Sequence, residues 1–93
     1  MRVSDHFRDD VIGPERHPSR EGITYERCVR IVSERRYTEA SGDELIVWGY
    51  APELPGHTKW LKVVTDAEAS VLITAHKDRR FARRMGTAGE QGS

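Results

Sequence analysis

Apolar residues follow a helical period in the first third of the chain and a strand-like period after it. From Val3 to Ile12 they recur mainly at intervals of four, which predicts a short helix. Gly13 and Pro14 end that pattern. Residues 13 to 22 combine two prolines, two glycines and a serine, a composition typical of a loop. The chain is therefore expected to begin with a helix and a loop.

The clearest amphipathic stripe lies between residues 25 and 35. Four apolar residues fall at i, i+3, i+4 and i+7, namely Tyr25, Cys28, Val29 and Val32. Four charged residues lie outside that stripe, namely Glu26, Arg27, Arg30 and Glu34. Thr24 precedes the stripe and is a good N-cap, because its hydroxyl can accept from a free amide of the first turn. We predict a helix from residue 25 to about residue 35.

After residue 36 the pattern changes to strands. A turn signal at residues 41 to 43 separates the segments 36–40 and 44–50, which predicts a hairpin. Two prolines and a glycine make residues 51 to 56 a loop. The segments 60–65 and 70–75 predict a second hairpin. Four mainly antiparallel strands are therefore expected.

The end of the chain is predicted to be a short basic helix over residues 77 to 85, followed by a disordered tail over residues 86 to 93. With one core, residues 1 to 85 form a single domain. The predicted fold class is α+β: one or two N-terminal helices packed on a four-stranded, mainly antiparallel sheet, with a short basic C-terminal helix.

Composition narrows the class of protein. The chain has 93 residues, of which 37% are hydrophobic and 32% charged, so a sheet covered on one face only is expected. Cys28 is the only cysteine, which fits a reducing compartment. No apolar run suits a membrane span, and the first residues lack the apolar core of a secretory signal. We expect a cytoplasmic protein that does not associate with membranes.

Charge is uneven although the net charge is zero. Residues 1 to 56 carry 8 basic and 11 acidic side chains, whereas residues 57 to 85 carry 7 basic and 3 acidic. The segment from His76 to Met85 alone holds five basic residues against Asp78. Such a local excess favours an anionic partner. The histidines and the cysteine match no metal-binding spacing, so neither a metal nor another cofactor is predicted.

Four segments carry a family resemblance: residues 60–65, residues 71–81, a His6-Phe7-Arg8 start and a Gly22-Ile23-Thr24 helix entry. In these segments the chain resembles the RelE/ParE superfamily of bacterial toxins, and most closely BrnT-like proteins. The resemblance covers about residues 5 to 84. It implies the RelE-like fold and the toxin component of a type II toxin–antitoxin system. In many members the toxin is an endoribonuclease that cleaves mRNA, whereas others inhibit gyrase and some have no known activity. For this chain we predict a metal-independent endoribonuclease acting on mRNA. The implied partners are a cognate antitoxin protein and RNA, free or on the ribosome, and a homodimer is a further expectation for so small a chain.

RNA cleavage without a metal needs a base, cations that stabilise the developing phosphorane, and an acid for the leaving oxygen. In our hypothesis His76 is the acid/base, Arg79 and Arg80 hold the scissile phosphate, and Lys62 supplies a further cation. Five more residues are expected to bind nucleic acid: Lys77, Arg83 and Arg84 through charge, and Tyr50 and Trp48 by stacking on a base.

Each of these residues could also have a purely structural role. A run of charges is more often an ordinary solvated face, and aromatic residues in strands are more often packing than stacking surfaces. The alternative function is a non-catalytic protein- or nucleic-acid-binding module on the same fold. A third alternative is an antitoxin or a small regulatory subunit.

Overall fold

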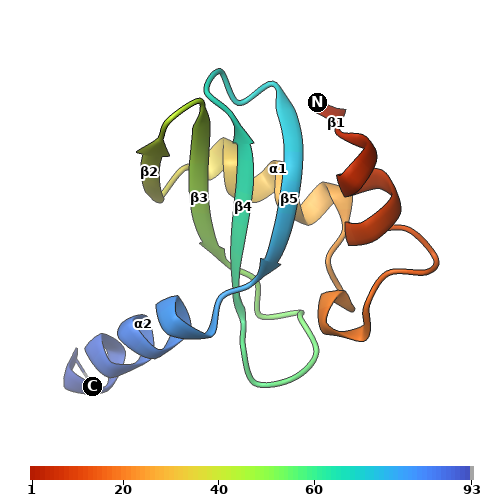
Figure 1. The fold of residues 1–93 in the computed structure, drawn as a ribbon. Coiled ribbons are helices and arrows are strands. Elements are labelled where there is room, and N and C mark those ends of the chain that lie inside the picture. Colours follow the sequence, from red (N-terminus) through yellow and green to blue (C-terminus); the bar gives the residue numbers. More distant parts are fainter. Residues whose placement is uncertain (93) are drawn as a thin grey trace.

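The computed structural model describes the backbone of residues 1–92 and the side chains through residue 86. It is an α+β fold with a five-stranded mixed sheet and two main helices (Figure 1). The strands are β1 (Arg2–Val3), β2 (Tyr37–Ser41), β3 (Glu44–Tyr50), β4 (Trp60–Asp66) and β5 (Val71–Lys77). Their order across the sheet is β1-β5-β4-β3-β2. The helices are α1 (Tyr25–Glu34) and α2 (Arg79–Gly92), with single turns η1 (Phe7–Val11) and η2 (Pro18–Arg20).

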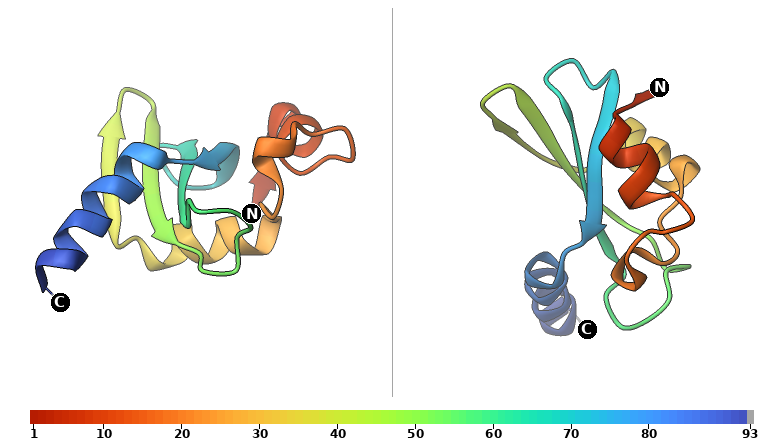
Figure 2. Two further views of the ribbon diagram at one scale, coloured as in Figure 1. Left: turned by 90° about the horizontal axis from the view of Figure 1, so that it is seen from below. Right: turned by 45° about the vertical axis from the view of Figure 1, so that its right-hand side comes forward.

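The two helices lie on opposite faces of the sheet (Figure 2). The main apolar core lies between α1 and the sheet, where α1 packs on β3 and β4, and it continues under η1, which packs on β5. Its largest fully buried members include Ile31, Leu61 and Leu72. We call the face that α1 covers the inner face. The opposite face, which α2 crosses at one end, is the outer face.

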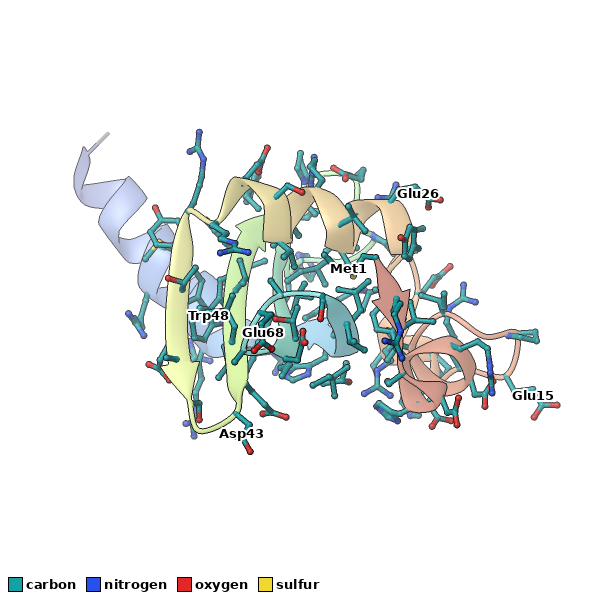
Figure 3. The ribbon with its side chains drawn as sticks, turned by 90° about the horizontal axis from the view of Figure 1, so that it is seen from above. Met1, Glu15, Glu26, Asp43, Trp48 and Glu68 are labelled. Carbon is teal, nitrogen blue, oxygen red and sulfur yellow. The ribbon has the colours of Figure 1, made fainter. Side chains whose placement is uncertain are left out.

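Helix α1 begins and ends as its sequence predicts. The Thr24 hydroxyl accepts a hydrogen bond from the amide of Arg27 at 3.1 Å, which caps the first turn. Arg35 ends the helix in the left-handed conformation, with a φ of 47°. Glu26 in the first turn points away from the sheet (Figure 3). The predicted helix is thus confirmed to within one residue.

Strand β3 lies close to α1 at Gly49. A Cβ placed there would lie 2.5 Å from Cγ1 of Ile31 and 2.8 Å from its Cγ2. Glycine therefore permits close packing of α1 on β3. Both predicted hairpins are present. In the structure they are β2–β3 and β4–β5, both antiparallel, and Asp43 lies at the tip of the first (Figure 3).

The prediction of four strands and a helix from residue 3 is wrong at the N-terminus. Arg2 and Val3 form a fifth strand, parallel to β5, so the sheet is mixed. Ser4 then caps the helical segment: its hydroxyl accepts from the amide of Phe7 at 3.0 Å and donates to the carbonyl of Ile73 at 2.9 Å. The register of β4 and β5 shifts beside Ile73. The serine hydroxyl thus satisfies a carbonyl at this irregularity.

The C-terminal helix also differs from its prediction. It begins at Arg79 instead of residue 77, because Lys77 still belongs to β5. Its backbone continues to Gly92, beyond the expected end at residue 85. Side chains from residue 87 onward, and Ser93, lie outside the described part of the chain, so the disordered tail over residues 86–93 stays a prediction. No described helix is long and apolar enough to cross a membrane.

Candidate functional site

Lys62 and His76 lie side by side on the outer face of the sheet. They are direct partners in the register of β4 and β5, and Lys62 is also the partner of Trp48 on β3. Side chains paired in this way have Cβ atoms about 5 Å apart. All three side chains are partly buried. The structure therefore brings together the predicted base and one predicted cation.

The surroundings of His76 favour its neutral form. Burial lowers the pKa of the His76 imidazole, and the positive charge of Lys62 lowers this pKa further. Asp78 opposes the shift, while Arg20 on η2 adds to it. A neutral imidazole near pH 7 can accept a proton. The neighbouring ammonium can stabilise negative charge, which is the pairing that general-base chemistry on a phosphodiester requires.

Asp78 is one of the residues that sequence reasoning missed. Its Oδ1 accepts from the amide of Phe81 at 2.9 Å and so caps α2, and its Oδ2 accepts from the indole Nε1 of Trp48 at 2.9 Å. Burial by itself would raise the pKa of this carboxyl, but the two hydrogen bonds and the charge of Lys62 outweigh burial and lower the pKa. An aspartate directly before a helix is an N-cap signal that could have identified it.

The two aromatic residues predicted to stack on bases differ in their surroundings. The Trp48 ring stacks on that of Phe81, with centroids 5.0 Å apart and planes 8° from parallel. Trp48 thus serves to attach α2 to the sheet. Tyr50 is 53% exposed and touches Trp60, with ring centroids 5.3 Å apart. Only Tyr50 keeps much of its ring accessible to a base.

The predicted arginines all lie on α2, outside the Lys62–His76 pair. Arg79, Arg80, Arg83 and Arg84 have exposed side chains. Arg84 lies over the ring of Phe81, with its guanidinium carbon 5.4 Å from the centroid. Among the side chains of residues 1–86, none of these arginines forms an ion pair with a carboxylate. They remain available to an anion, although α2 leads away from the sheet (Figure 2).

A pocket of about 330 Å³ lies at the end of β5, where Arg79 approaches the strand; we call it the loop pocket. It is lined by Ser19, Pro55, Gly56, His57, Thr58, His76, Lys77 and Arg79. Lys77 follows His76 in β5, and successive side chains of a strand point to opposite faces of the sheet. The Lys77 Nζ donates to the carbonyl of Pro55 at 3.2 Å. His57 and Thr58 were not predicted as site residues, because nothing local in the sequence relates the loop 51–59 to β5.

Within the residues that the structure describes, no group of three or more histidine, cysteine or acidic residues could hold a metal ion. Comparison with known proteins adds no relative: no family model, no curated protein and no solved structure matches this chain.

Proposed function

We propose that this chain is a toxin-like, metal-independent endoribonuclease acting on mRNA, with a RelE-like fold and a cognate antitoxin as its partner in a type II toxin–antitoxin system. The observation that carries the proposal is the adjacency of His76 and Lys62 on the outer face of the sheet. His76, with its lowered pKa, is assigned the proton transfer. Lys62 is assigned the stabilisation of charge on the phosphate, and Arg79 and Arg80 the binding of the strand. The cytoplasmic location belongs to the same proposal.

The test is induced expression of the chain in bacteria, with growth and mRNA integrity followed over time. Two variants address the pair directly, His76→Gln and Lys62→Met. Arg8→Gln is the matched control, since Arg8 is an exposed cation on η1 that is paired with Asp9 at 2.9 Å, outside the site. We expect growth arrest and mRNA loss with the unchanged chain and with the control, and neither with the other two variants.

Folding and metal dependence need separate controls. Each variant should keep the far-UV circular dichroism spectrum of the unchanged chain, so that loss of activity is not loss of fold. Lysates should cleave RNA in the presence of a chelator of divalent cations. Normal growth with intact mRNA, from a folded protein, would refute the ribonuclease. Cleavage that persists in both site variants would refute the residue assignment.

The second candidate is a non-catalytic module that binds nucleic acid or protein. It is favoured by the position of the α2 arginines, which are exposed and lie outside the Lys62–His76 pair. Binding to RNA without cleavage, weakened by charge removal on α2 but not by His76→Gln, would favour this candidate over the enzyme.

A further inference from the structure

The lining of the loop pocket is strongly biased in charge. Four of its residues have basic side chains: His57 on the loop, His76 and Lys77 on β5, and Arg79 at the start of α2. Arg79 is a permanent cation. No carboxylate is among the eight lining residues. Three segments that are distant in the sequence, η2, the loop 51–59 and the junction of β5 with α2, supply them. A site built in this way is suited to an anion.

The loop that carries His57 is held in place on both sides. The amide of Ala51 donates to the carbonyl of Lys59 at 2.7 Å, which closes the base of the loop. Leu54 is buried in the core with 1% exposure. The Nζ of Lys77 donates to the carbonyl of Pro55 at 3.2 Å. The pocket is therefore largely formed before a ligand arrives, so little conformational entropy opposes binding.

The donors fit a phosphate group. Arg79 offers a planar guanidinium with several N–H groups, and Lys77 and the two imidazoles surround the same space. The Thr58 hydroxyl is a further donor, whereas the Ser19 hydroxyl is already hydrogen-bonded to Nδ1 of His17 at 2.9 Å. A tetrahedral anion accepts from several directions at once, as these donors require. The pocket volume, about 330 Å³, is near the lower end of ligand sites and suits a nucleotide-sized group.

We propose that the loop pocket is a phosphate subsite that holds a phosphate of a polynucleotide strand next to the phosphate at Lys62 and His76. His76 connects the two positions, because it lines the pocket and is the cross-strand partner of Lys62. That the bound phosphate belongs to a strand being cleaved rests on the proposed function. Phosphate binding itself does not.

The test is an NMR titration of the folded chain with inorganic phosphate and with adenosine 3′-monophosphate, at fixed pH and ionic strength. Adenosine and sodium chloride are the matched controls for the base and for salt. The imidazole resonances of His57 and His76 should shift saturably with both phosphates and not with either control. Arg79→Gln should bind about tenfold more weakly, because it removes a charge-assisted contact. Arg8→Gln should bind like the unchanged chain.

A loss of loop structure must be distinguished from a loss of contact. His57→Asn serves as a second variant, because it removes an imidazole from the pocket lining and leaves the hydrogen bond from Lys77 to Pro55 untouched. It should also weaken binding. Shifts that do not saturate, or that are equal in Arg79→Gln, would overturn the subsite. Equal shifts with sodium chloride would do so as well.

The two proposals can fail separately. Saturable phosphate binding without any RNA cleavage would leave the subsite in place and remove the ribonuclease. Cleavage with an unchanged KM for RNA in both His57→Asn and Arg79→Gln would leave the ribonuclease in place and remove the subsite.

Discussion

Asp78 forms one hydrogen bond to α2 and one to Trp48 on β3, and its replacement by alanine should remove both. One carboxylate oxygen caps α2 through the amide of Phe81, and the other accepts from the indole of Trp48, each at 2.9 Å. Loss of an N-cap costs about 1 kcal/mol. Loss of a hydrogen bond to a charged group costs about as much again. We therefore expect Asp78→Ala to lower the free energy of unfolding by about 2 kcal/mol, or Tm by roughly 10 °C in a domain of this size.

Two further variants divide that loss between the two bonds. Asp78→Ser keeps an oxygen that can cap Phe81 but gives up the indole, so it should lose about 1 kcal/mol. Trp48→Phe removes the indole N–H and keeps an aromatic ring on Phe81. In that background Asp78→Ala should cost only the cap, about 1 kcal/mol, and the difference from the cost in the unchanged chain is the Asp78–Trp48 coupling.

The assay is urea unfolding followed by far-UV circular dichroism and by tryptophan fluorescence. Circular dichroism reports the whole domain, and fluorescence reports the packing around Trp48 and Trp60. The reasoning is refuted if Asp78→Ala changes the free energy of unfolding by less than about 0.5 kcal/mol, the size expected for an ordinary surface substitution. It is also refuted if the double-mutant cycle gives no coupling between Asp78 and Trp48.

Three other outcomes follow from the structure. Gly49→Ala should cost about 1–3 kcal/mol by overpacking; adding Ile31→Ala should relieve the clash, whereas Ile31→Val keeps both Cγ atoms and should not, as a double-mutant cycle would measure. Cys28 should resist thiol reagents until urea unfolds the chain, because burial raises its pKa to about 12; fast labelling of the folded protein would contradict this. Finally, the pKa of His76 is lowered in the folded chain, so as pH drops the unfolded chain binds the proton at a higher pH than the folded chain. The free energy of unfolding should therefore fall as pH drops below the ordinary histidine pKa of 6.5 towards the lowered value. Urea unfolding at several pH values should show a smaller fall in His76→Gln.

Sequence reasoning succeeded where one short segment determines its own structure. Helix α1 has an apolar stripe and a capping threonine within eleven residues, and both hairpins have turn residues between β-branched strands. The strand register then places Lys62 opposite His76. Their proximity was inferable in outline, because both lie on neighbouring strands and on the same side of the alternation.

The rest depends on contacts between distant segments. β1 has only two residues, and its pairing with β5 joins residues about seventy positions apart. No local sequence pattern therefore predicts this strand. Val3 fits the helical period equally well, which is why it was predicted to be helical. The loop pocket has the same origin: Ser19, His57 and Arg79 line it together although they are far apart in the sequence. Trp48 shows a further limit, since the alternation places it on the outer face but does not reveal that Phe81 covers it.

A chain of zero net charge can still bind a polyanion if the binding is short-ranged. Screening in physiological salt limits the reach of exposed charges to about 8 Å, so a bound ligand responds mainly to the charges close to it and little to the net charge of the chain. The same screening means that the chain gains little from long-range attraction, unlike a uniformly basic protein. Its affinity would then come from placed contacts: the His76–Lys62 pair, the donors of the loop pocket and a few arginines of α2. A site of this kind engages few phosphates, so its affinity should depend less steeply on salt than that of a broad basic surface. The neutral composition is therefore compatible with the proposed RNA site and favours recognition by local geometry over general attraction to nucleic acid.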